Sequence, residues 1–209
     1  MRVLRAVNYQ RMPWKNGGGE TIEMIVSPER ASFDDFDWRI SMARVAAPGP
    51  FSQFPGIDRT LSVIAGHGLS LVVDGQTIAL NRSSAPLRFS GDARVDSVLR
   101  DGAIDDLNVM TRRGRCDHRV SRVLLTTATT LRWEGEISVV VAIGSDVDLR
   151  IGSETVTLAS RDAVVFDAHD AREFVASSNG EATLYLIDIF YPLNRARLSP
   201  PRRRGTSIP

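Results

Sequence analysis

The chain has 209 residues, of which 43% are hydrophobic and 24% charged, a composition typical of an ordinary globular protein with a core of normal size. The formal net charge is +1, so no global electrostatic attraction to nucleic acid or to a membrane surface is expected. The single cysteine, Cys116, excludes an intrachain disulfide and suits a reducing compartment. Because no segment has the long apolar run of a signal sequence or membrane span, we expect a cytoplasmic protein.

The first informative segment in chain order is 14–21, which reads Trp-Lys-Asn-Gly-Gly-Gly-Glu-Thr. Glycine is used where the backbone adopts a positive φ or approaches another group closely, and each glycine costs conformational entropy. Three consecutive glycines beside Lys15, Asn16 and Glu20 indicate a loop shaped around a polar small molecule. The alternative is a plain glycine-rich turn between two strands.

Alternation of apolar and polar residues predicts strands along most of the chain. Segment 38–42 places three apolar side chains on one face and two polar ones on the other. Asp74 and Gly75 form a strong hairpin signal between two such segments. Helical periodicity is scarce, and 32–36 could form at most a short turn of helix. The expected fold is therefore all-β, a sandwich or barrel. The further expected strands are 59–63, 69–73, 76–80, 139–143, 148–151, 155–158, 163–166 and 183–190.

An internal repeat refines this expectation. With an offset of 78 residues, Gly66 falls on Gly144 and Leu71 on Leu149. Further matches occur at the same or nearly the same offset: 77–80 with 155–158, Phe89 with Phe166, and Leu107 and Val109 with Leu184 and Leu186. Chance alternation could produce some of these matches, but the shared glycine and hairpin spacing favour a duplication. Two jelly-roll β-barrel (cupin) halves in one chain constitute a bicupin.

The repeat and the composition predict three regions. Residues 1–115 would form an N-terminal cupin barrel with the ligand pocket, and 116–198 a second, degenerate cupin barrel. Residues 199–209 contain three consecutive arginines between prolines and are expected to be a basic disordered tail without a nucleic-acid role.

Three segments place polar side chains together on one face of a strand, and inside a barrel these faces would converge with the 14–21 loop. Those side chains are Arg39 and Ser41, then Arg59, then Asp106 and Asn108, which share their face with Met110. Arginine forms bidentate hydrogen bonds with carboxylates, lysine adds a point charge, and asparagine both donates and accepts. The set therefore predicts a pocket for a small anionic metabolite. The alternative is that the arginines are ordinary surface residues and the aspartate a turn residue.

Neither a metal site nor a serine hydrolase is indicated. His67, His118 and His169 do not form the His-x-His pair with a following glutamate that is typical of metal cupins, so no metal and no cofactor are expected. A Gly-x-Ser-x-Gly motif is missing too. A metal-free acid–base enzyme using Glu20 and Lys15 stays open, ranked below binding.

Taken together, these segments resemble the HutD/Ves family of bacterial proteins. The resemblance is carried by segments 14–21, 36–43, 49–61, 89–92 and 105–113. It implies a bicupin without a required metal and a regulatory or accessory role in histidine utilisation. The family's signature positions in this chain, which the resemblance implies as ligand contacts, are Lys15, Asn16, Glu20, Arg39, Ser41, Arg59, Asn108 and Met110.

The leading hypothesis is a metal-independent bicupin that binds a small carboxylate metabolite of histidine degradation. Candidate ligands are urocanate, formiminoglutamate, formylglutamate and formate. The second hypothesis is a metal-free isomerase or hydrolase with Glu20 or Asp106 as acid–base residue, and the third is a protein-interaction module. Neither nucleic acid nor a membrane is expected as a partner, and exposed edge strands are compatible with a homodimer.

Overall fold

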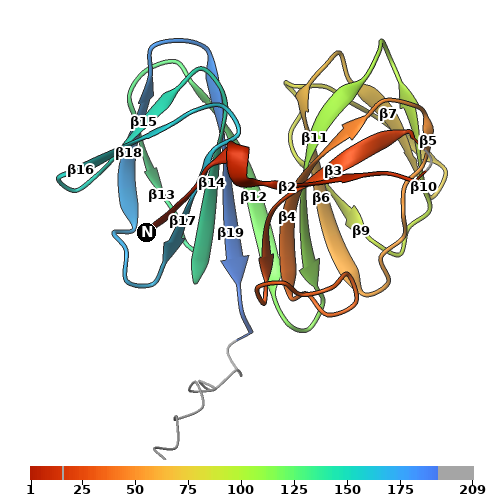
Figure 1. Cartoon of the computed structure of the whole chain (residues 1–209), viewed down its shortest axis with the longest axis horizontal. Coiled ribbons are helices and arrows are strands. Elements are labelled where there is room, and N and C mark those ends of the chain that lie inside the picture. Colours follow the sequence, from red (N-terminus) through yellow and green to blue (C-terminus); the bar gives the residue numbers. More distant parts are fainter. Residues whose placement is uncertain (16, 193–209) are drawn as a thin grey trace, which may run out of the picture.

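The computed structural model describes residues 1–15 and 17–192, and the predicted basic tail 199–209 lies outside the described residues. The described chain forms nineteen β-strands and one short 3-10 turn, η1 (Ala6–Asn8), arranged as four antiparallel sheets (Figure 1). The prediction of an all-β protein is confirmed. Within the described part of the chain, no helix is long and apolar enough to cross a membrane.

Two sheets enclose one core and form the first sheet pair. The larger has the order β2 (Gln10–Pro13), β3 (Gly19–Ser27), β4 (Trp38–Val45), β11 (Ile104–Arg112), β6 (Ile57–Ala65) and β9 (Leu87–Ser90). The smaller has the order β5 (Gly49–Pro50), β10 (Val95–Leu99), β7 (Leu69–Val73) and β8 (Gln76–Leu80). Side chains of both sheets, among them Leu61 and Leu71, share one apolar cluster.

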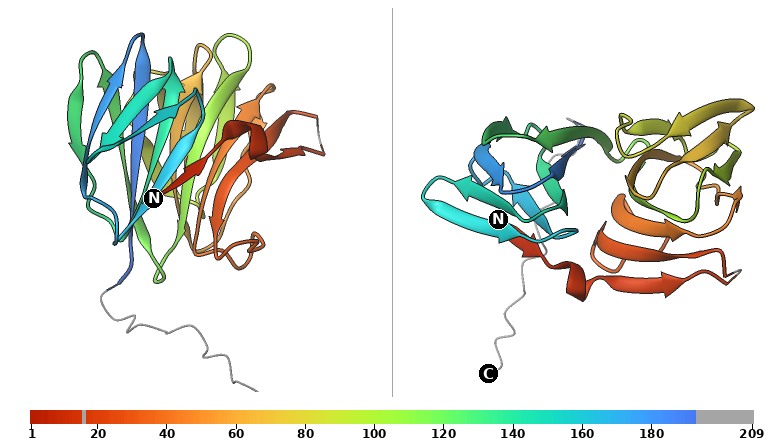
Figure 2. Two further views of the ribbon diagram at one scale, coloured as in Figure 1. Left: turned by 60° about the vertical axis from the view of Figure 1, so that its left-hand side comes forward. Right: turned by 90° about the horizontal axis from the view of Figure 1, so that it is seen from above.

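The second sheet pair is built in the same way. Its larger sheet has the order β1 (Arg2–Leu4), β17 (Ala163–Asp167), β14 (Ile137–Gly144), β19 (Ala182–Phe190) and β12 (Asp117–Leu125). Its smaller sheet has the order β13 (Thr129–Arg132), β18 (Glu173–Ser178), β15 (Val147–Ile151) and β16 (Glu154–Leu158). The chain therefore begins in the second sheet pair and crosses through η1 to the first (Figure 2).

The predicted strands and hairpin are present, and the strand order repeats between the two sheet pairs. The orders β4-β11-β6-β9 and β5-β10-β7-β8 correspond to β12-β19-β14-β17 and β13-β18-β15-β16. Gly66 and Gly144, matched by sequence, both have positive φ, at 86° and 101°. A Cβ at either would collide with a carbonyl oxygen, of Ala103 and Glu181 respectively, so both positions need glycine.

One detail of the sequence repeat is wrong. Leu107 contributes to the core between the two sheet pairs, whereas Leu184 lies inside the second pair. In the first sheet pair, Asp106 pairs with Ala43 and Val63. In the second, Leu184 pairs with Val123 and Ala142 at the equivalent position of the ladder. The strand pairing therefore makes Asp106 the counterpart of Leu184. Because β19 is apolar on both faces, apolar matching alone could not fix which residues face inward.

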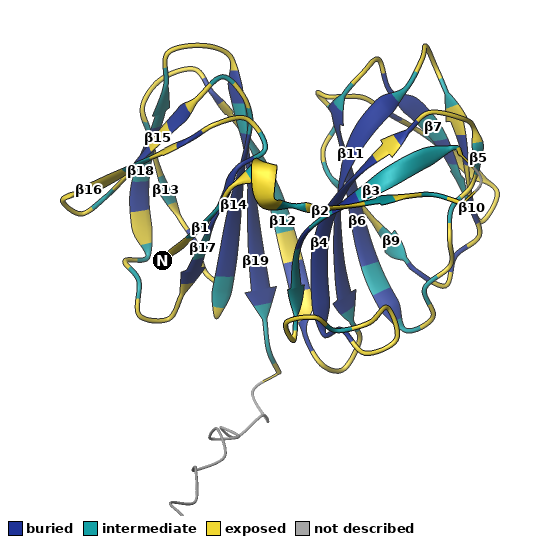
Figure 3. Ribbon diagram, viewed as in Figure 1, coloured by how far each residue is buried: buried dark blue, intermediate teal, exposed yellow. Residues whose placement is uncertain are grey.

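The two sheet pairs are joined by an apolar interface. The outward face of β4 and β11 contributes Ile40 and Leu107, and the facing strands β14 and β19 contribute Val139 and Ile187. These strands are the dark, buried centre of Figure 3. Alternation along β4 and β11 therefore sends one set of side chains into this interface and the other into the interior of the first sheet pair.

His118 on β12 is a buried structural residue at this junction. Its Nε2 lies 2.7 Å from Oγ1 of Thr60, and its Nδ1 lies 2.6 Å from Oγ1 of Thr111. A neutral imidazole can donate from one nitrogen and accept at the other, which suits two hydroxyl partners. Burial, assisted by Arg88, lowers the pKa of His118 from 6.5 to about 4.

This lowered pKa predicts acid sensitivity. The folded state binds a proton at His118 less readily than the unfolded state does. As far as this group is concerned, the free energy of unfolding is therefore at its maximum above pH 6.5 and decreases as the pH falls from 6.5 towards about 4. The loss should reach about 3 kcal/mol. Urea unfolding of wild type and His118→Gln between pH 4 and 8 checks this: the variant should lack this slope, and identical pH profiles would contradict the assignment.

Candidate functional site

A cavity of about 640 Å³ opens inside the first sheet pair. Its floor is the inward face of β4, β6 and β11, and its wall includes β2, β3 and the loop between β5 and β6. The lining residues are Met12, Pro13, Trp14, Lys15, Thr21, Phe33, Arg39, Ser41, Ala43, Val45, Pro50, Phe51, Ser52, Phe54, Arg59, Asp106, Asn108 and Met110.

Strand register brings the polar residues of the floor together. Met110 of β11 pairs with Arg39 on one side and with Arg59 on the other, so the two arginines flank it. Two residues along the same strand pair, Asn108 pairs with Ser41. Residues two apart on a strand share a face, so all of these side chains project into the cavity.

A chain of hydrogen bonds links three of them. Nε of Arg59 donates to Oδ1 of Asn108 at 2.7 Å, and Nδ2 of Asn108 donates to Oδ1 of Asp106. Since an amide has one acceptor oxygen and one donor nitrogen, this chain fixes the orientation of the Asn108 side chain. Arg59 and Asp106 are thus coupled through Asn108.

Arg59 is the central cation of the cavity and is only 7% exposed. Its guanidinium carbon lies 4.9 Å from the ring centre of Phe51 and 5.5 Å from that of Phe89. Burial, with a smaller contribution from Arg39, lowers its pKa from 12.5 to about 10, so it stays charged near neutrality. Nη1 and Nη2 make no hydrogen bond to the described residues, so the fork that suits a carboxylate is free.

Arg39 is the second buried cation, 3% exposed. Nε donates to Oε2 of Glu23 at 2.7 Å and Nη1 donates to Oγ of Ser41 at 3.1 Å. The guanidinium carbon lies 4.8 Å from the ring centre of Phe33. The remaining nitrogen, Nη2, is buried and has no hydrogen-bond partner among the described residues. A ligand oxygen would satisfy it.

Asp106 is the buried acid of the cavity. Burial raises its pKa from 3.8 to about 7, while the charge of Arg59 and the hydrogen bond from Asn108 oppose the rise. The amide of Ala43 lies near this carboxyl group and also lowers the pKa, but Oδ2 accepts no hydrogen bond from the described residues. Asp106 can therefore change protonation state near neutral pH.

The structure gathers most of the predicted residues but not all. Arg39, Ser41, Arg59, Asn108 and Met110 line the cavity together, and Lys15 lies exposed at its edge. Asn16 lies outside the described residues. Glu20 is not among the lining residues and forms an ion pair with Arg11 at 2.9 Å. Thr21, the next residue of β3, is the one that lines the cavity, because adjacent strand residues face opposite sides.

Several participants had no clear sequence signal. Glu23 has the same parity on β3 as Thr21, and the alternation could have predicted that it faces inward, but only the structure shows its bond to Arg39. The aromatic residues Phe33, Phe51 and Phe54 come from loops, where periodicity gives no direction. Trp14 was part of the glycine-rich motif, and its Nε1 donates to Thr21 at 2.8 Å.

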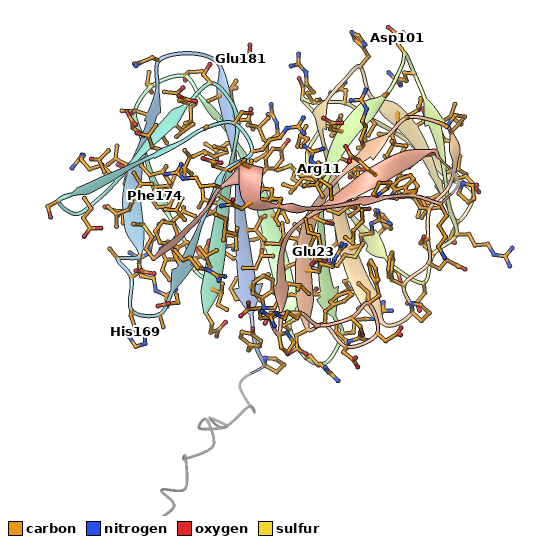
Figure 4. All side chains as sticks on the ribbon, viewed as in Figure 1. Arg11, Glu23, Asp101, His169, Phe174 and Glu181 are labelled. Carbon is orange, nitrogen blue, oxygen red and sulfur yellow. The ribbon has the colours of Figure 1, made fainter. Side chains whose placement is uncertain are left out.

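The histidines are dispersed. His67 is an exposed neighbour of Asp101, His118 is held by two threonines, and His169 projects from a loop of the second sheet pair, far from Glu23 (Figure 4). Among residues 1–15 and 17–192, no three histidine, cysteine, aspartate or glutamate side chains are grouped so that they could hold a metal ion.

The second sheet pair fills the equivalent space with apolar side chains. The ladder position of Arg59 is occupied there by Ser138, and that of Asp106 by Leu184. Phe166 stacks on Trp133 at 5.8 Å and on Phe174 at 5.5 Å, and all three are buried. The polar cavity is thus a property of the first sheet pair.

These features define an all-β protein of paired antiparallel sheets with a buried, arginine-rich cavity. A cupin 2 conserved barrel domain protein from Leptotrichia buccalis shares the fold, with a TM-score of 0.52, 9% identity, and coverage of 82% of this chain and 88% of that one. The chain belongs to the HutD family, whose model matches residues 6–184.

Relatives agree with this membership. An uncharacterised 21.2 kDa protein in the hutC 3′ region of Pseudomonas putida is 35% identical over 73% of this chain and 83% of its own length. Protein Ves of Citrobacter koseri is 39% identical over 64% of this chain and 70% of its own. HutD from Pseudomonas fluorescens SBW25, solved in a formate condition, has a TM-score of 0.77 and 30% identity, covering 91% of this chain and 98% of that one. The family is linked to histidine utilisation by name and genomic context.

Proposed function

We propose that the chain is a metal-independent bicupin that binds a small carboxylate metabolite of histidine degradation and acts as a regulatory or accessory factor in histidine utilisation. Each sheet pair would be one cupin barrel, with the ligand in the first. The observation that carries the proposal is the free fork of Arg59 beside the unpaired Nη2 of Arg39. Charge-assisted, bidentate hydrogen bonds are the strongest that a protein offers a carboxylate.

The surroundings of the two arginines support an anion. The cavity adds Lys15 at its edge, Glu23 balances the charge of Arg39, and burial raises the pKa of Asp106 to about 7, so this carboxyl group is only partly ionised near neutral pH. The 640 Å³ volume is within the range of small-molecule sites. The candidate ligands are urocanate, formiminoglutamate, formylglutamate and formate, and the formate condition of the HutD structure from P. fluorescens makes formate a natural first probe.

The test is a thermal-shift and calorimetric screen of chelator-treated protein against these four compounds, with histidine and glutamate added. A ligand that binds only the native state raises the melting temperature by mass action. At least one carboxylate should bind without metal. If none binds at millimolar concentration, the proposal fails, and a search for a protein partner becomes the next step.

Removing the carboxylate that balances Arg39 should strengthen binding. In Glu23→Gln, Arg39 keeps a hydrogen-bond acceptor at 2.7 Å but loses its counter-charge. We expect the dissociation constant of the screen's best carboxylate to fall roughly tenfold, about 1.4 kcal/mol. Titration calorimetry at low ionic strength measures it. As a control, Glu134→Gln removes an exposed partner of Arg119 and should leave binding unchanged. Unchanged or weaker binding in Glu23→Gln would contradict the role given to Arg39.

A second candidate function rests on Asp106. A carboxyl group with a pKa of about 7, facing a cavity, has the property of a general acid or base. The chain would then be a metal-free isomerase or hydrolase acting on such a metabolite. Turnover by metal-free protein, followed by NMR and abolished in Asp106→Asn, would support this function, and no turnover of any bound ligand would exclude it for the compounds tested.

A further inference from the structure

Two buried atoms of the same cavity lack a partner, and they are of opposite kind. Side-chain atoms in this condition among the described residues are Arg39 Nη2, Asp106 Oδ2, Arg122 Nε and Ser138 Oγ. The residues that carry the first two, Arg39 and Asp106, both line the cavity. A buried polar group without a partner is costly, and such groups are therefore rare in folded proteins. Both atoms are thus positions where a ligand group is expected.

The two atoms ask for different ligand groups. Arginine is a donor only, so Nη2 of Arg39 needs an acceptor, which a carboxylate oxygen provides. Asp106 already accepts from Asn108 at Oδ1, and the hydrogen bond from Arg59 to Asn108 keeps that amide from turning round. The free Oδ2 is thus the group of Asp106 that is left to meet a ligand, and in the ionised carboxylate it is an acceptor.

We propose that Asp106 is a specificity-determining residue that selects carboxylates carrying an N–H donor. This inference rests on the proposed function, because the carboxylate end is the part held by Arg59 and Arg39. The ligand class is a small acid with an amide, amidine or imidazole N–H, placed so that the acid meets the arginines while the N–H meets Oδ2 of Asp106. A simple fatty acid or dicarboxylate would leave Oδ2 unpaired, and the loss of such a pairing is what gives polar sites their selectivity.

The charges around Asp106 make the direction of its pH dependence a test. Arg59 faces Asp106 from β6, and Asp105 is the neighbour of Asp106 on β11. Arg39 lines the same cavity from β4 and is paired with Glu23 of β3. A ligand N–H stabilises the ionised carboxylate, so preference for such a ligand should grow as the pH rises through neutrality. A ligand that instead required a protonated Asp106 would bind more tightly at low pH.

The experiment compares matched ligands that differ in the N–H group. N-formyl-L-glutamate is paired with glutarate, which has the same two carboxylates and no amide. Urocanate is paired with 3-(2-furyl)acrylate, whose ring lacks the N–H. Calorimetry at pH 8 should show the N–H compound of at least one pair binding tenfold or more tightly than its partner. For the glutamate pair, the ratio should increase from pH 6 to pH 8.

The matched variant is Asp106→Asn. Because Asn108 donates to the remaining oxygen, the new amide should place its N–H₂ where Oδ2 was and turn the acceptor into a donor. Loss of the Asp106 charge should act alike on both members of a pair, so the test is their affinity ratio: the preference for the N–H compound over its partner should fall tenfold or more. Asp188→Asn, the same change at a buried carboxylate of the second sheet pair, should leave both affinities unchanged.

The outcomes distinguish the carboxylate site itself from the selectivity assigned to Asp106. If both members of every pair bind wild type equally, or if Asp106→Asn weakens both equally, the inference about Asp106 is overturned and the carboxylate site stands. If no compound binds wild type, the inference and the proposed function both fail. Circular dichroism of Asp106→Asn establishes that the variant is folded before its affinities are compared.

Discussion

Arg59→Ala is expected to reduce the affinity for every carboxylate ligand by a hundredfold or more. The substitution removes the cavity guanidinium whose two terminal nitrogens make no hydrogen bond to the described residues, and it leaves the cavity with Arg39, which is already engaged by Glu23 and Ser41. Losing one partner of a buried charge pair typically costs 2–5 kcal/mol, so about 3 kcal/mol is expected here. Calorimetry with the best ligand of the screen measures it.

The controls separate charge from geometry. Arg59→Lys keeps a cation but lacks the fork, so its affinity should lie between those of wild type and the alanine variant. Arg119→Ala removes the arginine that occupies the ladder position of Arg39 in the second sheet pair, and it should bind normally. If Arg59→Ala is folded by circular dichroism and binds every ligand as wild type does, the cavity is not the carboxylate site.

Strands with alternating faces could be predicted from the sequence, and so could the residues that such alternation places together. Arg39 and Ser41 alternate with apolar residues, and so do Asn108 and Met110, which is why their common face was visible before the structure. Period-2 patterns carry this information because each residue must choose one of two environments. Strand pairing then brings the two faces side by side.

Residues outside regular alternation could not be placed in this way. Strand parity separates Glu20 from Glu23, but the hydrogen bond between Glu23 and Arg39 depends on how β3 pairs with β4, which the sequence alone does not give. Phe33 and Phe51 reach the cavity from loops whose course depends on tertiary packing. Neither strand pairing nor the course of a loop can be predicted from composition and residue spacing.

The difference between the two sheet pairs also depends on register. Matching Leu107 to Leu184 hid the fact that an acid in one pair stands where a leucine stands in the other. With Asp106 as the counterpart of Leu184, the polar cavity of the first pair and the aromatic filling of the second become alternative solutions for the same strand framework. The polar cavity leaves buried polar atoms without hydrogen-bond partners, which destabilises the folded state. Ligand binding would explain why the chain keeps these residues.

The stability of Asp106→Asn measures that cost. The folded-state pKa of Asp106, about 7, lies above its ordinary value of 3.8, so the folded protein holds a proton that the unfolded chain has released. Its stability therefore falls as the pH rises from 3.8 towards 7 and stays low above that. A shift of this size corresponds to about 4 kcal/mol. Asp106→Asn carries no such charge and should be more stable than wild type by a few kcal/mol at pH 8.

Urea unfolding of both proteins at pH 4.5 and pH 8 tests this expectation, with the stability difference much smaller at pH 4.5. The contribution of His118 is common to both proteins and cancels in the comparison. Asp188→Asn, which breaks an ion pair with Arg119 at 3.0 Å, should instead be destabilised at pH 8. A less stable Asp106→Asn at pH 8 would mean that the carboxylate contributes to folding. A variant that is more stable yet less selective would show that the chain gives up stability at Asp106 for recognition, the trade-off expected of a binding site.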